Sequence, residues 1–183
     1  MRITPSDLIP EPLSIDQTLL PGTVEYAPDV RQTGSLHVLG TAEHIEEHRG
    51  PRDIVDDIRL RARFQGDFEL LCARCLDPIT HRADQRFDLI FRPSGVDAEL
   101  GERSISEAET EIGYYEKSGL LLEDVIREQV LLSLPDRSLC QEQCKGLCPH
   151  CGENLNESAC KCGSARIDPR WSALQGLSSV SKA

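Results

Sequence analysis

The sequence predicts an α+β fold: an antiparallel β-meander, or partial barrel, with one amphipathic helix and a C-terminal cysteine-rich module. Three observations lead to this prediction. Apolar and polar residues alternate along much of the first half of the chain, helical spacing dominates one internal segment, and six of the eight cysteines lie between Cys140 and Cys162. A chain of 183 residues, 39% of them hydrophobic, is long enough for one core with a small appended module.

Strands are predicted along residues 13–92. The first 50 residues contain short apolar stretches separated by turn residues such as Pro21 and Gly22, a pattern typical of short strands. From residue 58 to 64 apolar side chains alternate with arginines, the period of two expected of a strand with one buried face. Gln65–Asp67 predicts a turn or bulge. Because the connections leave no room for crossover helices, we expect antiparallel pairing throughout.

A charged loop and a helix follow the strands. Residues 95–117 contain seven acidic residues against only Arg103 and Lys117, and we interpret them as a solvated loop rather than a docking site. From residue 119 to 134 apolar residues recur at the spacing of an amphipathic helix. The helix is expected to end near Leu134, because a proline follows. Residues 1–135 are therefore predicted to form the sheet domain, with this loop and helix included.

The cysteines are predicted to be metal ligands. No stretch approaches the roughly 18 apolar residues of a membrane span, and residues 1–12 lack the features of a signal peptide, so we expect a cytoplasmic protein. Thiols stay reduced there, and such a set more often binds metal than forms disulfides. Cys148–Gly152 resembles a zinc knuckle: its spacing aims two sulfurs at one ion, and glycine permits positive φ. Structural zinc is therefore favoured over redox catalysis, an iron–sulfur cluster or catalytic zinc.

Eight thiolates suffice for two zinc ions, but the sequence leaves their pairing open. The preferred partition groups the last four cysteines, with Asn154 and Asn156 turning the chain between them, and joins the strand-borne CxxC to the first two cysteines of the tail. The sets are Cys148, Cys151, Cys160 and Cys162, and Cys72, Cys75, Cys140 and Cys144. An alternative joins the two CxxC pairs and leaves the other four as a second set or as unliganded thiols. Residues 136–177 are thus predicted to form a zinc-binding module closed by a short helix, followed by a disordered tail over 178–183.

A formal net charge of −11 argues against general phosphate binding. Any RNA contact must be confined to a local basic patch, and a basic protein partner is at least as plausible. Candidate contact residues are Arg74, Lys145, Arg166 and Arg170. An outward row of arginines is expected to pair with neighbouring carboxylates instead; it consists of Arg59, Arg61 and Arg63. No acid/base pair, GxSxG or phosphate loop is present in the sequence, so we predict no enzymatic activity and no small-molecule substrate.

Four motifs occur in order between Cys72 and Trp171: Cys72–Leu76, the helix ending in Leu132–Pro135, Cys144–Asn156 and Asp168–Trp171. Together they resemble the YceD family of bacteria and plastids. The resemblance implies a role in the accumulation of large-subunit ribosomal RNA, through synthesis, processing or stability of the 23S species, with no catalytic activity. The implied partner is the large-subunit precursor or a basic ribosomal or assembly protein. A zinc-responsive or thiol-redox regulator is the alternative.

Overall fold

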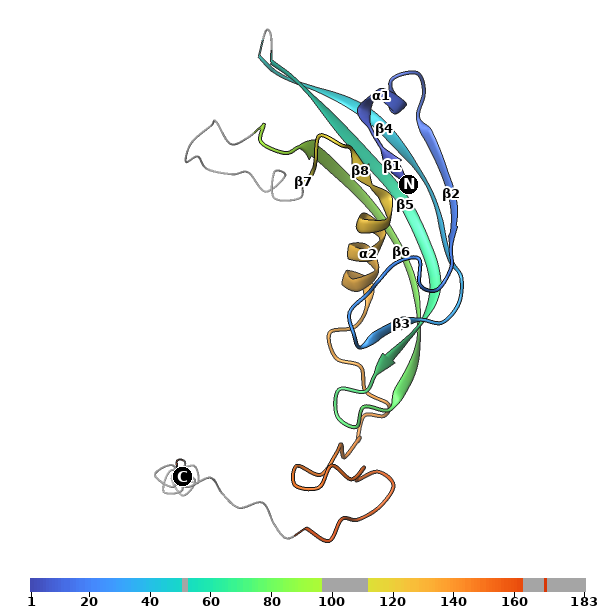
Figure 1. Cartoon of the computed structure of the whole chain (residues 1–183), viewed down its shortest axis with the longest axis vertical. Coiled ribbons are helices and arrows are strands. Elements are labelled where there is room, and N and C mark those ends of the chain that lie inside the picture. The colour runs from blue at the N-terminus through green and yellow to red at the C-terminus, as the bar shows by residue number, and fades with distance from the viewer. Residues whose placement is uncertain (51–52, 97–111, 163–169, 171–183) are drawn as a thin grey trace, which may run out of the picture.

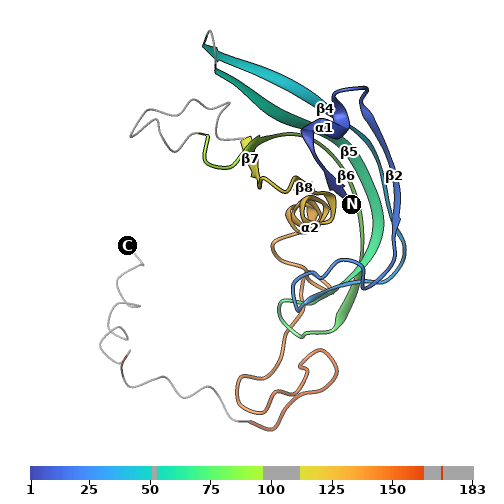
Figure 2. The same cartoon turned by 45° about the horizontal axis from the view of Figure 1, so that its top comes forward.

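The computed structural model describes residues 1–50, 53–96, 112–162 and 170. Most of them belong to one curved sheet that wraps around a helix (Figures 1 and 2). The described part of the chain contains two α-helices, so the fold is mostly β, a half-barrel, rather than evenly mixed α+β. The elements are β1 (Arg2–Ile3), α1 (Pro5–Leu8), β2 (Leu13–Leu19), β3 (Val30–Gln32), β4 (Leu36–Gly50), β5 (Asp53–Leu71), β6 (Pro78–Pro93), β7 (Ile112–Tyr115), β8 (Leu120–Leu121) and α2 (Leu122–Ser133).

The main sheet has the order β2-β4-β5-β6-β7, and β3 pairs with β5. Every pair up to β5–β6 is antiparallel, as the sequence predicts, but β7 runs parallel to β6. The connection over residues 94–111 is long enough for the crossover that parallel neighbours need. Prediction of a loop over 95–117 is therefore wrong for Ile112–Tyr115, and residues 97–111 lie outside the described part of the chain.

Strand β5 carries the centre of the core. Most of its apolar residues belong to the same core cluster as those of α2, its arginines face outward, and Phe64 and Phe68 are completely buried. The strand runs unbroken through Gln65–Asp67, so the predicted turn or bulge is wrong. A Cβ at Gly66 would lie 2.7 Å from Cδ1 of Leu36, so this glycine allows close packing against β4 instead of a turn.

Helix α2 packs inside the curve of the sheet (Figure 2). Its buried face is the apolar stripe that the sequence predicts: Leu122, Val125, Ile126 and Val130. The helix begins later than predicted because Leu120 and Leu121 form β8, which pairs with β1. The amino group of Met1 forms an ion pair with Glu123, so the N-terminus is held at the start of α2. The helix ends at Ser133, one residue before the predicted end.

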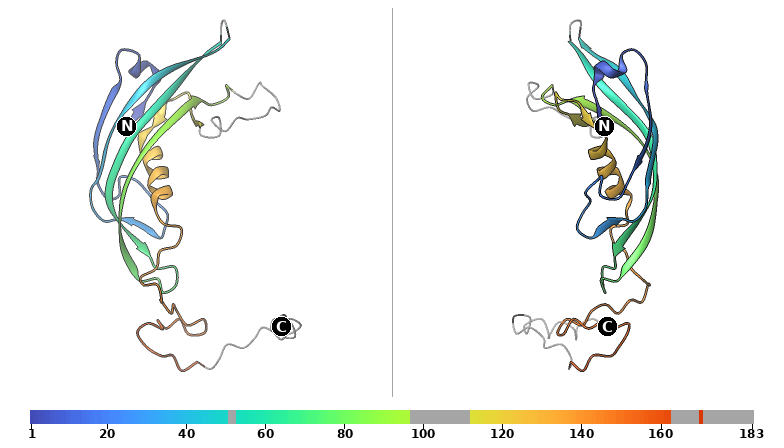
Figure 3. Two further views of the ribbon diagram at one scale, coloured as in Figure 1. Left: turned by 180° about the vertical axis from the view of Figure 1, so that it is seen from behind. Right: turned by 45° about the vertical axis from the view of Figure 1, so that its right-hand side comes forward.

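The cysteine-rich segment lies beyond one end of the sheet (Figure 3). The turn between β5 and β6 carries the first CxxC at that end, the hairpin position that the sequence predicts. Backbone hydrogen bonds join turn and segment: Ala73 N–H donates to the carbonyl of Ser138 at 2.8 Å, and Leu147 N–H donates to Arg74 at 3.0 Å. Apart from Arg170, the predicted terminal helix and tail lie outside the described residues, and the domain boundary near residue 135 stays a prediction. Neither described helix has the length and apolarity to cross a bilayer.

Candidate metal centres

All eight cysteines lie in two groups of four, and within each group the Sγ atoms are within 4.8 Å of one another. We call the group nearer the sheet the first centre and the other the second centre. The first centre consists of Cys72, Cys75, Cys140 and Cys144, and the second of Cys148, Cys151, Cys160 and Cys162. This is the preferred partition, and the alternative that joins the two CxxC pairs is wrong.

The first centre joins the sheet to the tail. The β5–β6 turn supplies two cysteines, and the segment that follows α2 supplies the other two. Leu76 N–H donates to the carbonyl of Cys72 at 2.9 Å and closes the turn. Three of the thiols are buried and Cys140 is exposed. Three apolar side chains pack against the buried thiols: Ile79, Leu139 and Leu147.

The second centre is built within the tail and is more open. Gly152 N–H donates to the carbonyl of Cys148 at 2.9 Å, and Gly152 has a φ of 76°, the positive φ expected of a knuckle turn. Cys148 N–H donates to Glu153 and returns the chain toward Cys160. Cys148 is buried, whereas Cys151 and Cys162 are exposed. The ring of sulfurs therefore lies close to solvent.

The spacing of the sulfurs fits one tetrahedral ion per centre. Zinc–thiolate bonds of about 2.3 Å place neighbouring sulfurs about 3.8 Å apart. The Sγ–Sγ distances are 3.8 Å for Cys72 and Cys144, 3.6 Å for Cys75 and Cys140, and 3.4 Å for Cys148 and Cys160. An iron–sulfur cluster spreads its four thiolates over two or four irons, so some of its sulfurs lie farther apart than around a single ion. The donor sets are therefore compatible with zinc.

Hydrogen-bond donors stabilise thiolates in both centres. N–H groups of Cys151 and His150 lower the pKa of Cys148 to about 6. Burial opposes ionisation of Cys72, but backbone N–H groups, including that of Cys140 at 3.4 Å, lower its pKa to about 6. Burial and the carboxylate of Asp77 raise the pKa of Cys75. A divalent ion must displace the remaining thiol protons, so loading is expected to release protons.

Two asparagines connect the two centres. Asn156 accepts a hydrogen bond from Lys145 N–H at 2.8 Å, so its Oδ1 faces that backbone and its Nδ2 donates to Sγ of Cys144 at 3.3 Å. Nδ2 also donates to Oδ1 of Asn154 at 2.9 Å, and Asn154 donates to Asp77 at 3.2 Å. The loop that closes the second centre therefore donates to a sulfur of the first. The sequence indicates only turn residues at these two positions, because their hydrogen-bond partners are brought close by tertiary packing.

Three of the four predicted RNA or partner contacts lie in the described part of the chain: Arg74, Lys145 and Arg170. The guanidinium of Arg74 donates to the carbonyl of Cys144 at 2.7 Å and so supports the first centre. Lys145 is exposed beside it, and Arg170 is exposed in the tail. Arg166 lies outside the described part of the chain.

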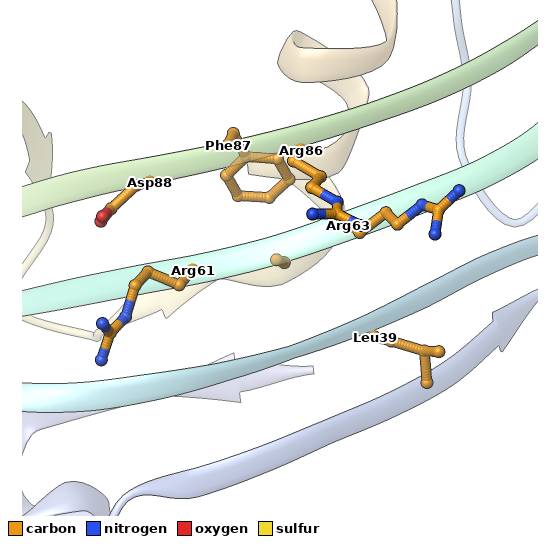
Figure 4. A pocket seen from close by; sticks show the side chains of 7 residues that line it. Leu39, Arg61, Arg63, Arg86, Phe87 and Asp88 are labelled. Atoms are coloured by element: carbon orange, nitrogen blue, oxygen red, sulfur yellow. The ribbon is translucent and has the colours of Figure 1, made fainter.

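The outward arginines of β5 are paired with carboxylates, as predicted. Arg59 contacts Asp88 at 2.8 and 2.7 Å, and Arg63 contacts Asp84 at 2.8 Å. Arg61 reaches Glu43 on the other neighbouring strand at 2.8 Å. A depression of about 430 Å³ lies on this face, lined by charged side chains and by Leu39 and Phe87. Figure 4 shows the side chains that line it. The charges on these arginines are therefore largely balanced within the sheet, which disfavours the row as a phosphate-binding surface.

These features define a half-barrel protein with two four-cysteine centres, each able to hold a metal ion. The chain belongs to the YceD family: the family model described as large ribosomal RNA subunit accumulation protein YceD matches residues 60–178, which include all eight cysteines.

Relatives with known sequences share parts of this region. Uncharacterised proteins of Mycobacterium tuberculosis and Mycobacterium bovis are 36% identical over 106 residues, 56% of this chain and 47% of theirs. The chain thus spans about half the length of these relatives. The chloroplastic YCED homolog 1 of Arabidopsis thaliana, a large ribosomal RNA subunit accumulation protein, is 38% identical over 52 residues, 28% of this chain and 16% of the plant protein. No solved structure matches.

Proposed function

We propose that this chain is a non-enzymatic ribosome-biogenesis factor that supports synthesis, processing or stability of 23S ribosomal RNA. The observation that carries the proposal is the grouping of all eight cysteines into two four-sulfur centres in a chain of the YceD family. A catalytic zinc site keeps one position open for water or substrate, whereas four sulfurs fill the coordination of one ion. Both centres therefore suit a structural role.

The proposed cofactor is zinc, one ion in each centre. The separations between sulfurs match a tetrahedral ion, and thiolates are ligands that zinc prefers. An ion in the first centre would fasten the tail to the β5–β6 turn. An ion in the second would order a segment that has few apolar side chains of its own.

The proposed partner is a basic ribosomal or assembly protein, alone or on the large-subunit precursor. The net charge of −11 repels a phosphate backbone, and carboxylates already pair with the arginine row. A basic protein is instead attracted to the acidic chain, which favours association of the two. Direct RNA contact would be local, near Arg74 and Lys145.

Sedimentation of native lysate tests this function. The chain is expected to comigrate with large-subunit precursors. Its depletion is expected to lower the amount of mature 23S RNA and to raise the amount of its precursor. After nuclease treatment at physiological salt, a pulldown is expected to retain a ribosomal or assembly protein. Recovery of bare ribosomal RNA without such a protein would contradict the proposed partner, and unchanged 23S RNA on depletion would contradict the function.

A thiol-redox or zinc-responsive regulator is the second candidate. It is supported by the second centre, where Cys151 and Cys162 are exposed and the pKa of Cys148 is lowered to about 6 by backbone N–H groups. This role predicts substoichiometric zinc and a reversible disulfide under mild oxidation. The structural role predicts full zinc occupancy and thiols that do not react.

A further inference from the structure

A depression of about 190 Å³, lined by both apolar and acidic side chains, lies beside the first centre. Four parts of the chain line it: the chain just before β3 with Asp29, the end of β5 with Leu71, the CxxC turn with Leu76, and the segment after α2 with Leu134 and Pro135. Strand β3 pairs with β5, and the first centre and its backbone hydrogen bonds hold the CxxC turn and the segment after α2 together. The depression therefore exists only where the tail is fastened to the sheet.

Leu76 has a backbone conformation that its side chain disfavours. Its φ is 63°, and it is the one non-glycine residue of the described chain with positive φ. In the second CxxC turn the same position is Gly152, with φ 76°, and both residues donate to the carbonyl of the first cysteine at 2.9 Å. Glycine accepts this conformation freely, whereas a residue with a Cβ is strained in it. The turn itself therefore does not call for leucine at position 76.

Burial in the fold does not account for this leucine either. Leu76 is 57% exposed and Leu71 is 40% exposed, and both line the depression. A strained backbone and an exposed apolar side chain at one position each cost stability in the isolated chain. A contact made outside the chain would offset both.

Charge indicates which partner fits. Asp29 and Asp136 line the depression, and its described lining residues include no cationic side chain. An apolar floor with an acidic rim complements a peptide that carries an apolar side chain between lysines or arginines, and it repels phosphate.

We propose that this depression docks a segment of a protein partner that inserts one apolar side chain and places basic residues against Asp29 and Asp136. Leu76 provides the contact surface for the apolar side chain. The inference rests on the proposed function, in which the partner is a basic protein, and it gives the place and the chemistry of that contact.

The test uses the full zinc-loaded chain and two labelled lysine-rich peptides, one with a central leucine and one with serine at that position. Fluorescence anisotropy should show the leucine peptide binding about tenfold more tightly, the effect of burying part of one aliphatic side chain. Leu76→Gly should abolish the preference without lowering zinc content or thermal stability. The control variant is Leu132→Ser, which removes another exposed leucine and should keep the preference. Serine is chosen there because glycine would destabilise helix α2.

A second variant tests the charged rim. The double change Asp29→Asn and Asp136→Asn should weaken both peptides and reduce the salt dependence of binding. Equal binding of the two peptides, or an unchanged preference in Leu76→Gly, would overturn the proposal. So would preferential binding of a single-stranded oligonucleotide, or self-association of the chain that Leu76→Gly abolishes.

The two proposals fail separately. If Leu76→Gly loses the preference for the leucine peptide and cells with this variant still accumulate normal 23S RNA, the docking site stands and its link to the proposed function fails. If depletion of the whole chain leaves 23S RNA unchanged, the proposed function fails whatever the peptides show.

Discussion

Asn156→Asp should weaken metal binding at the first centre although Asn156 belongs to the loop of the second. The side chain donates from Nδ2 to Sγ of Cys144 at 3.3 Å and accepts from Lys145 N–H at 2.8 Å. Aspartate has nearly the same shape and keeps the acceptor for Lys145. It replaces the donor with a carboxylate oxygen that faces a thiolate, so the change removes the hydrogen bonds to Sγ of Cys144 and to Oδ1 of Asn154 and leaves the shape of the side chain unchanged.

A hydrogen bond to a charged group contributes about 1.5–3 kcal/mol, and about 1.4 kcal/mol corresponds to a factor of ten in affinity. Losing the donor to Cys144 should therefore lower zinc affinity of the first centre about 10–100-fold, the range seen for residues that hydrogen-bond to metal ligands. The second centre keeps all four sulfurs and its backbone donors, so its affinity should stay the same.

Competition with a chromophoric chelator measures the two affinities as separate steps, and Cys144→Ser identifies the step that belongs to the first centre. The matched control is Gln143→Glu, which adds the same charge at an exposed position beside Cys144 and removes no donor to a sulfur. If Asn156→Asp and Gln143→Glu lower the affinity equally, the effect is general electrostatics and the hydrogen-bond argument is refuted.

Three further predictions concern the sheet and the tail. Gly40→Ala should lower the free energy of unfolding by about 1–3 kcal/mol in urea, because its Cβ would lie 2.3 Å from a carbonyl oxygen of β5; Gly34→Ala, with its nearest atom at 4.0 Å, should stay within about 0.5 kcal/mol. Burial raises the pKa of Tyr26 and of Tyr115 to about 12. The folded state thus favours the neutral phenols. Their contribution to the free energy of unfolding is complete below pH 10 and is lost as the pH rises through 12. Ultraviolet titration should show late tyrosinate formation, and ionisation of every tyrosine near its ordinary pKa would contradict this. Chelation of the metal at neutral pH should raise amide hydrogen exchange in residues 140–162 earlier than in strand β5. If the tail and β5 exchange at the same time, the tail does not depend on metal.

The spacing of apolar residues predicted β5 and α2, because each of these elements is determined by its own segment of sequence. The alternation of arginines with apolar residues predicted β5 because a strand with one buried face requires it. The apolar stripe of α2 was predicted for the same reason at helical spacing. Strand β7 was missed, because Ile112–Tyr115 follow an acidic stretch and their pairing with β6 depends on where the chain returns. Gly66 was read as a turn, because contact with Leu36 on another strand has no local signal.

The candidate site divides in the same way. The CxxC spacing predicted which sulfurs pair locally, because a tight turn places its two sulfurs together whatever surrounds it. The union of Cys72 and Cys75 with Cys140 and Cys144 was the preferred partition, but the sequence left it open because it depends on tertiary packing. The role of Asn156 and the strained turn at Leu76 could not be predicted, since each depends on packing between the tail and the β5–β6 turn. One signal for Leu76 is visible afterwards: a leucine stands where the other CxxC turn has glycine.

Metal and thiol analysis of the chain purified without added metal tests the central claim most directly. Two structural centres predict about two zinc ions per chain, no visible absorption, and thiols that react only after chelation. Substoichiometric zinc with a reversible disulfide, or the visible absorption of an iron–sulfur cluster, would contradict the account.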